Sequence, residues 1–360
     1  MKIKDRYIAK TFLTYTLVVL LVWLSIYGFF NFLSELASVG TKDYTILEAL
    51  KYTILQMPQV AYDQSSAVIL LGCILGIGHL ATTGQLIIFR IAGTSILKIS
   101  WISVKYGLIF IITTILIGEN IAPFLNIYAD TGRANALGEN SVLANQKGFW
   151  IRDGDNFINV ENNVDGRIFY GITVIELNET NKIQRVIKSE SALFDGNSLS
   201  LNKSDIFSID KKGFFENISL RDRNSYDKTV SFNTELVNNL KKAPEDLTTW
   251  SIFKQIQFLS DNNLRSGVFE VELYKRVLKP LTLTAMILIA MLFVFGSTRD
   301  ASLGRKIFFG VAIGLSFELI SRIGGTMALN FDFSPLISSI LPAFLAIIIS
   351  ISLLTKKSMS

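Results

Sequence analysis

The chain has 360 residues, of which half are hydrophobic and 18% are charged, whereas a typical soluble protein carries about 25% charged residues. Its net charge of +5 does not indicate nucleic-acid binding, because basic residues in the terminal thirds flank apolar runs and those in the middle third are interleaved with Asp and Glu. Apolar residues gather in 10–125 and 277–355. This distribution predicts an α-helical polytopic membrane protein with a soluble domain inserted in mid-chain.

Three apolar runs precede the middle third, at 12–33, 58–81 and 99–121. Each is close to the ~20 residues that a helix needs to cross ~30 Å of hydrocarbon. The first run has no charged residue and is longer than the apolar core of a cleaved signal peptide. We therefore expect three transmembrane helices in this part of the chain, the first of them uncleaved.

Three further runs follow the middle third, at 277–298, 307–329 and 333–355. Their lengths again suit membrane-spanning helices, which brings the expected number to six. We expect Pro342 to interrupt the last run, which is closed by Lys356 and Lys357.

The basic residues of the short loops predict the orientation. A cytoplasmic N-terminus would place these on the inner side: Lys2, Lys4, Arg6, Lys10, Arg90, Lys98, Arg299, Arg305, Lys306, Lys356 and Lys357. The opposite short loops hold Lys42 and Lys51. Because cytoplasmic loops are enriched in Lys and Arg, we expect both termini in the cytoplasm and the middle segment on the outer side.

The middle segment, about 140–233, has the pattern of short strands. The stretches 157–160 and 167–175 are rich in β-branched and aromatic residues. Three turn signals separate such stretches: Asp153-Gly154-Asp155, Asp195-Gly196-Asn197 and Lys212-Gly213. Short strands at this spacing predict a sandwich or a β-jelly-roll-like domain. An amphipathic helix is expected over 248–261, before the chain returns to the membrane.

No enzymatic constellation is visible in the sequence. The chain has one histidine, His79, and one cysteine, Cys73, and it contains neither a phosphate-binding loop nor paired metal ligands. Both residues lie in an apolar run, so packing roles are expected for them. We therefore expect a non-enzyme without metal or cofactor, in which an ATP-driven role would require a separate ATPase subunit.

The loop between the second and third runs is unusually apolar for a cytoplasmic loop. Residues 85–91 read Gln-Leu-Ile-Ile-Phe-Arg-Ile, and Gly93 ends the helix-like stretch. Such a short apolar helix either lies on the membrane surface or docks in the groove of a partner protein. The pattern alone leaves both interpretations open.

Two charged residues fall inside the fifth run. Glu318 and Arg322 are four residues apart, so they can pair on one face of a helix. Ionisable side chains within a membrane usually face a cavity or a partner. The pair therefore either neutralises itself or forms a polar patch on a wall that meets an amphiphilic substrate.

Several motifs, taken in order, resemble those of the lipopolysaccharide export permeases, the LptF/LptG (YjgP/YjgQ) family, and the LptG type most closely. The resemblance covers essentially the whole chain. The matching motifs are Asp5-Arg6-Tyr7-Ile8, Arg90-Ile91-Ala92-Gly93, Gly118-Glu119-Asn120-Ile121-Ala122-Pro123, Arg133-Ala134-Asn135-Ala136, Gly148 to Phe157, Lys279-Pro280-Leu281 and Leu341-Pro342.

The resemblance implies a function. Family members pair as an LptF–LptG heterodimer in the bacterial inner membrane and bind a dimeric LptB-type ATPase. ATP hydrolysis then drives lipopolysaccharide out of the membrane, and periplasmic jelly-roll domains pass it to an LptC-type partner and a bridge. The implied domains are 1–132 with a cytoplasmic coupling helix at about 82–93, a periplasmic domain and connecting helix at 133–265, and 266–360.

The coupling helix implied by the resemblance assigns contacts with the ATPase to Gln85, Leu86, Phe89, Arg90 and Gly93. The family usually has a glutamate where this chain has Gln85, so a charge-assisted contact becomes a neutral hydrogen bond, roughly half as strong. We expect docking to depend more on Leu86, Phe89 and Arg90.

The lipid-contacting residues also depart from the family. Some members carry lysines along the outer part of the first span, whereas this chain has none between Asn31 and Lys42. As substitutes that contact the lipid's phosphates we expect Lys42, Arg133 and Arg322, and the full set of expected lipid-binding residues also includes Asn31 and Glu318. The first and fifth spans are expected to form one side of a lipid-accepting cavity.

Two other classes of function remain as alternatives. An ion-coupled secondary transporter would use Glu318, Arg322 and Asp63 as a relay, although the internal repeat common in such folds is not visible. A non-transporting scaffold of the cell envelope would use its outer domain to bind a protein partner.

Overall fold

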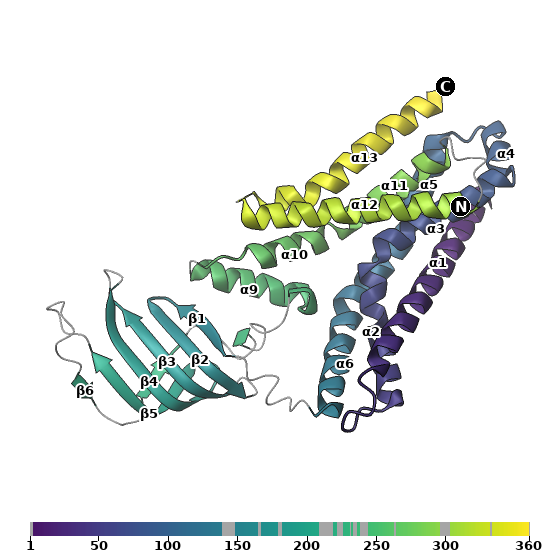
Figure 1. Ribbon diagram of the computed structural model, residues 1–360. Helices are drawn as coiled ribbons and strands as arrows, with labels where there is room; N and C mark the ends of the chain where they lie inside the picture. The colour runs from purple at the N-terminus through teal and green to yellow at the C-terminus, as the bar shows by residue number, and fades with distance from the viewer. Residues whose placement is uncertain are drawn as a thin grey trace. The chain divides into compact units, whose positions relative to one another are not determined.

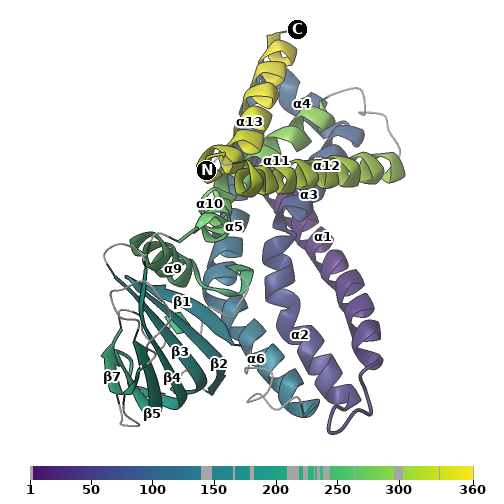
Figure 2. The ribbon, with the colours of Figure 1, turned by 60° about the vertical axis from the view of Figure 1, so that its left-hand side comes forward.

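The computed structural model describes residues 3–138, 148–164, 167–178, 182–208, 219–221, 226–230, 232, 236–237, 244–262, 264–295, 303–331 and 333–359. The chain forms two compact units (Figures 1 and 2). The helical unit comprises 1–39, 45–130 and 270–360, and the strand unit comprises 40–44 and 131–269.

The helical unit is built from long apolar helices joined by short loops. Before the inserted strands come α1 (Ile3–Leu36), α2 (Ile46–Asp63), α3 (Ser65–Thr82), α4 (Gln85–Ile91), α5 (Ile96–Leu116), the π-helix η1 (Ile117–Ile121) and α6 (Ala122–Ala136). After them come α10 (Gly267–Val277), α11 (Lys279–Val294), α12 (Leu303–Asn330) and α13 (Pro335–Met359). The last residues of α6, from 131, and the first three of α10 are counted with the strand unit.

The core of the helical unit lies where α3 packs against α1 and α11, with α5 beside them. Helix α3 can bury so much of its surface because it is apolar nearly all round. Gly72 lets it approach α1 closely, since a Cβ at this position would lie 2.5 Å from the Cα of Thr16.

The cysteine packs inside this part of the chain, as expected, whereas the histidine is exposed at the end of α3, where it contacts α1. Cys73 is buried with its Sγ 3.7 Å from Met291 Sδ on α11. The ring of His79 lies 5.5 Å from that of Tyr15 on α1.

The structure confirms that the predicted spans are long apolar helices, but the bounds of several differ from the prediction. Within the described residues, five helices are long and apolar enough to cross a membrane, and the bent pair α10–α11 makes a sixth if it is one span. The predicted second run, 58–81, is not one helix, because the chain breaks between α2 and α3 at Gln64. There the hydroxyl of Ser65 donates to the carbonyl of Tyr62 at 2.6 Å, a local bond that competes with helical pairing.

The third, fourth and sixth spans also differ from their predictions. The third continues through the π-helix as one stretch from Ile96 to Ala136, well past the predicted end at 121. The fourth, if α10 and α11 are one span, begins at Gly267 and bends by 53° between Val277 and Lys279, next to Pro280, which has no N–H to donate to the preceding turn. The interruption expected at Pro342 is wrong, because α13 continues through it, as membrane helices often tolerate proline.

The strand unit holds the predicted β-rich domain, and its described strands form one antiparallel sheet. In order along the sheet they are β1 (Phe149–Asp153), β2 (Asn156–Val164), β3 (Ile168–Leu177), β4 (Ile183–Phe194), β5 (Ser198–Ser208) and β6 (Ser219–Arg221). The strand β7 (Tyr226–Thr229) pairs with β5 as well. Gly154 and Gly196 have φ of +59° and +105° at two of the predicted turns, a conformation that glycine adopts without strain. The third, Lys212-Gly213, lies outside the described residues.

The sheet curls over its own core. Strand β5 divides its edge between β7 at one end and β6 at the other, and Lys203 between them has a left-handed φ of +52°. The ammonium of Lys228 on β7 pairs with Glu176 on β3, although β4 and β5 separate these strands along the sheet. The described strands therefore make one curled sheet rather than the two separate sheets of a sandwich.

A row of aromatic side chains fills the inside of the curl. The rings of Phe149, Phe169, Phe194 and Phe232 contact one another in sequence, with centroids 5.3–5.8 Å apart. The predicted amphipathic helix is present as α9 (Thr249–Asp261), which follows the short 3₁₀ helix η2 (Pro244–Asp246) and adds Phe258 to this core.

Candidate functional site

The short helix α4 lies between two glycines that set its limits. Gly84 precedes it with φ of +75°, and Gly93 follows it with φ of +76°. A Cβ at either position would meet nothing within 4 Å, so the backbone conformation rather than packing favours glycine. The predicted helix in the loop after the second span is therefore present, and Gly93 has a role in ending it.

The seven residues of α4 divide into an inner and an outer face. Leu86 is buried in the core of the helical unit, and Phe89 packs partly against that core with its ring 6.5 Å from that of Tyr7. The outer face carries Ile88, which is 65% exposed, and Ile91, which is 82% exposed. Arg90 is exposed as well.

Two of the predicted contact residues, Leu86 and Phe89, thus hold α4 in place, while the outer isoleucines are the apolar groups that α4 presents. Sequence reasoning missed this division, because seven residues are too few for periodicity to separate two faces.

The start of α1 is tied to the loop around α4. The ammonium of Lys4 donates to the hydroxyl of Thr94 at 2.7 Å, just beyond the end of α4. One side-chain oxygen each of Asp5 and Gln85 is buried without a hydrogen-bond partner within the described residues. Lys4 comes directly before the motif at 5–8, and Tyr7 lies within it. This motif therefore marks the part of α1 that contacts α4 and its loop, a contact that the sequence alone did not reveal.

The residues expected near the lipid fall into three places. Asn31 on α1 donates to the side-chain oxygen of Gln56 on α2 at 3.1 Å. Lys42 and Arg133 belong to the strand unit. There Lys42 donates to the carbonyl of Gly138 at 2.7 Å, and the Arg133 guanidinium lies 6.0 Å from the ring centre of Tyr44. The third place is on α12.

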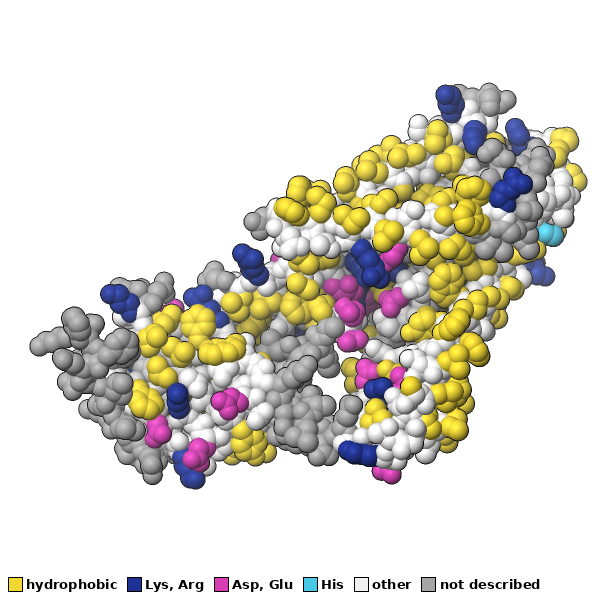
Figure 3. All heavy atoms as spheres, in the orientation of Figure 1, with side chains coloured by type: hydrophobic (Ala, Val, Ile, Leu, Met, Phe, Trp, Pro, Cys, Tyr) yellow, Lys and Arg dark blue, Asp and Glu magenta, His cyan; other side chains and the backbone are white. Residues whose placement is uncertain are grey.

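Glu318 and Arg322 pair on the surface of α12, as their spacing predicted. The Glu318 Oε1 and Arg322 Nε atoms are 3.1 Å apart, and both side chains are exposed. Hydrophobic side chains cover much of the outer surface of α12 and α13 (Figure 3). The pair therefore interrupts an apolar surface. This arrangement is compatible both with a pair that neutralises itself and with a polar patch that meets an amphiphilic substrate.

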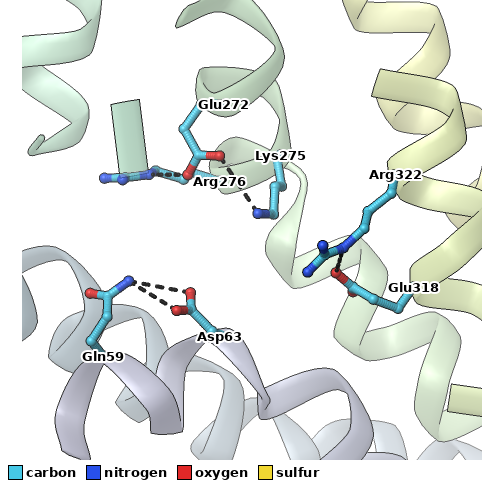
Figure 4. A network of polar contacts seen from close by, with 7 residues as sticks. All are labelled: Gln59, Asp63, Glu272, Lys275, Arg276, Glu318 and Arg322. Atoms are coloured by element: carbon cyan, nitrogen blue, oxygen red, sulfur yellow. Dashed lines mark hydrogen bonds and ion pairs between the residues drawn. The ribbon is translucent and has the colours of Figure 1, made fainter. Parts of the chain in front are cut away.

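A larger polar cluster, which the sequence did not reveal, includes this pair. Figure 4 shows side chains from α2, α10 and α12 turned toward a common space. Glu272 accepts a hydrogen bond from Arg276 at 2.9 Å and pairs with Lys275 at 3.6 Å. The side chain of Gln59 donates to Asp63 at 3.2 Å.

Lys279 lies where α10 ends and α11 begins, and it reaches toward α2. Its ammonium is 4.7 Å from the ring centre of Tyr62, and both residues are buried. One local signal, Pro280, marks the helix boundary at which Lys279 lies. The partner of Lys279 could not be read from the chain, because Tyr62 is more than 200 residues away.

The described residues hold no group of three or more His, Cys, Asp or Glu side chains that could bind a metal ion. What they do hold is a bundle of membrane-length helices, an inserted antiparallel sheet, a short apolar helix in a tight loop and a polar cluster among the helices. Together these define a multi-pass membrane protein with a domain inserted between its two sets of helices.

The comparisons with known proteins identify the family. The model of the family described as lipopolysaccharide export system permease LptF/LptG matches residues 6–356. The lipopolysaccharide export system permease protein LptG of Escherichia coli (strain K12) is 27% identical over 354 residues, which cover 98% of each chain. The protein of the same name from Haemophilus influenzae is 25% identical over 355 residues, again 98% of each chain.

The chain therefore belongs to the LptF/LptG family of lipopolysaccharide export permeases. It is a multi-pass, non-catalytic transmembrane subunit of the lipopolysaccharide export system. The resemblance drawn from its motifs is confirmed.

Proposed function

We propose that this chain is the LptG-type permease subunit of an ATP-driven exporter that extracts lipopolysaccharide from the inner membrane and passes it to a periplasmic bridge. The observation that carries the proposal is α4, a short helix held by its own bundle on one face and apolar on the other. A permease that relies on a separate ATPase needs such a surface, because the ATPase must bind the permease in order to change its conformation. The two LptG relatives, matched over 98% of their length, favour the LptG type.

The proposed orientation follows the basic residues. The start of α1, the α4 loop and the end of α13 lie in the cytoplasm, and the strand unit lies in the periplasm. The functional division is then 1–132 and 266–360 in the membrane, with 133–265 outside it.

The proposed partners match surfaces that the chain leaves exposed. An LptF-type permease covers α1 and α12, whose exposed leucine, isoleucine and phenylalanine side chains suit contact with other helices. An LptB-type ATPase dimer receives the outer face of α4 in a groove. An LptC-type partner contacts the strand unit.

Energy enters through α4 and passes to the bundle. When the ATPase closes, it displaces Ile88 and Ile91, and the buried Leu86 carries the displacement into the core that α3, α5 and α11 share. Phe89 carries it into α1 through Tyr7. The cavity that α1 and α12 line with the partner permease then narrows and expels the lipid.

The lipid meets the chain at apolar walls and at a few polar side chains. Its acyl chains lie against the exposed apolar surfaces of α1 and α12. Its head group meets Asn31, Glu318 and Arg322 in the membrane helices, where Arg322 attracts its phosphates. Separately, the cations Lys42 and Arg133 of the strand unit attract phosphates of the lipid that reaches that unit.

Ile88→Asp tests the proposal at the surface that carries it. A charge placed in an apolar docking contact costs on the order of 2 kcal/mol, so we expect the affinity for the ATPase to fall roughly 30-fold and export to stop. The variant should still insert, because Ile88 is exposed and does not support the core. The measurements are co-purification of the ATPase and lipopolysaccharide release from reconstituted vesicles.

The matched control is Ile183→Asp, which places the same charge at an exposed isoleucine on β4. It should retain both ATPase binding and export. Unchanged binding and export in Ile88→Asp would rule out α4 as the docking surface. Phe89→Asp is a less clean test, because it would also disturb the contact with Tyr7.

A further inference from the structure

Three helices of the helical unit are interrupted close to one another. Helices α2 and α3 are separated at Gln64, α5 passes into α6 through the π-helix η1, and α10 meets α11 at a 53° bend. Single π-helical turns within α-helices often mark functional positions. A break is also where a helix bends most easily, because few hydrogen bonds of the helical ladder have to change.

Tyr62 brings the three interruptions together. It is the next-to-last residue of α2, and its ring lies directly against Gly118 in η1, where an added Cβ would overlap the ring. Lys279, the first residue of α11, places its ammonium 4.7 Å from the centre of the same ring. The ring is therefore in contact with a glycine from one broken helix and a cation from another.

The helices on the two sides of these breaks are packed differently. On one side, α3, α5 and α11 bury many apolar side chains in one another and against the start of α1, and so form the core of the unit. On the other side, α2 buries few residues: Ala49, Thr53, Val60 and Tyr62. Segments with few buried contacts move at a lower free-energy cost than a packed core.

An apolar hollow of about 280 Å³ lies beside Tyr62, between α1, α2 and α5. Its lining includes Ala61 and Tyr62 from α2 and Leu17 from α1. The end of α2 is therefore not packed tightly against its neighbours on this side. Farther along α2, the terminal methyl of Met57 lies over Gly28 of α1, and an unbranched side chain such as Met adapts easily to a sliding neighbour.

Helices α2 and α6 are linked to each other by polar contacts at the surface. The Tyr52 hydroxyl donates to Asp130 at 3.3 Å, and the Lys51 ammonium lies 5.3 Å from the ring centre of Tyr128. These contacts join the two helices beyond their breaks, so a tilt of one carries the other with it.

We propose that Tyr62 is the pivot of a joint at which α2 and α6 tilt together relative to the packed group of α3, α5 and α11, and that Lys279 is the latch that holds Tyr62 against Gly118. Gly118 leaves the space in which the ring is seated. Lys279 holds the ring through its charge, and it follows the α10–α11 bend directly. The use of this tilt in lipid export rests on the proposed function.

Distances between spin labels test the joint in the full chain in lipid nanodiscs. The moving pair joins Leu47→Cys, near the far end of α2, to Phe344→Cys on α13, and the control pair joins Trp101→Cys on α5 to the same position on α13. All three side chains are exposed, whereas Cys73 is buried. Leu47 is 15 residues from Tyr62. At a helix rise of about 1.5 Å per residue, a tilt of about 10° moves the far end of α2 by roughly 4 Å.

We expect a broad distance distribution for the moving pair and a narrow one for the control pair. Lys279→Gln, which keeps a polar side chain but removes the charge, should shift the moving pair by several ångströms and leave the control pair unchanged. Compared with Lys279→Gln, Lys279→Arg should bring the moving pair back toward the original distribution, because it places a cation over the Tyr62 ring again.

If the distance distributions of both pairs are equally narrow in the chain with native Lys279, the proposed joint is wrong. This result does not depend on whether Lys279→Gln inserts into the membrane. A broad moving pair that Lys279→Gln does not change would overturn the latch. Neither measurement needs the ATPase, so a rigid joint would leave the proposed function intact. Loss of the proposed function would appear instead as a failure to bind the ATPase.

Discussion

Helices α3 and α12 are both apolar enough to cross a membrane, but they are used in opposite ways. In the most apolar stretch of α3, 72% of the residues are buried inside the chain, whereas in that of α12 only 6% of the residues are buried. The first packs against α1 and α11, and the second presents leucine, isoleucine and phenylalanine side chains outward around a charged pair. Hydropathy finds both helices, but only packing separates the scaffold from the surface that lipid or a partner covers.

The largest expected effect on stability comes from filling the closest helix contact of α3. Gly72→Ala would place a Cβ 2.5 Å from the Cα of Thr16, which cannot move without shifting α1. We expect a loss of about 3 kcal/mol in the free energy of unfolding. The measurement is the thermal unfolding midpoint in detergent.

Gly314→Ala is the matched control on α12. Its Cβ would lie 3.5 Å from a methyl group of Leu70, an ordinary contact, so the unfolding midpoint should be unchanged or slightly higher. Equal losses in the two variants would contradict the division between scaffold and surface helices.

A smaller loss of stability is expected in the strand unit, where a buried ion pair can be compared with an exposed one. Glu176 is buried and pairs with Lys228, and Arg185 also contacts it at 2.8 Å. Lys228→Met should cost about 1–2 kcal/mol, because it removes one partner of a buried carboxylate and the contact that closes the curl, while Arg185 remains. Hydrogen–deuterium exchange of the β3 and β5 amides in the full chain measures the loss as faster exchange.

The exposed pair of Lys203 and Glu190, 3.2 Å apart on the same sheet, provides the control. Lys203→Met should cost less than about 0.5 kcal/mol, because water screens exposed charges. A loss as large as that of Lys228→Met would mean that the curl does not depend on the buried ion pair.

Much of the fold could be predicted from local sequence. Apolar runs located the spans, and Gly154 and Gly196 marked two hairpin turns, because both features act within a few residues. The helix breaks were missed, since a window of hydropathy averages over Gln64 and over the π-helix. The jelly-roll-like domain was predicted, but the contact that closes its curl was not, because the pairing of Lys228 with Glu176 joins strands far apart in the chain.

The candidate site was predicted in place but not in detail. The apolar loop residues and Gly93 located α4 correctly, and the spacing of Glu318 and Arg322 predicted their pairing. Which side of α4 faces outward depends on how Leu86 meets the core of the helical unit, so it could not follow from seven residues. The contacts of Tyr62 with η1 and α11 likewise depend on three helices meeting.

The central claim is that this chain is a permease that works through the outer face of α4 with a separate ATPase. Affinity purification of the full chain from its own membranes in mild detergent tests this claim most directly. We predict that a nucleotide-binding subunit and a second multi-pass permease of the same family will co-purify with it. Recovery of the chain with neither protein would contradict the account.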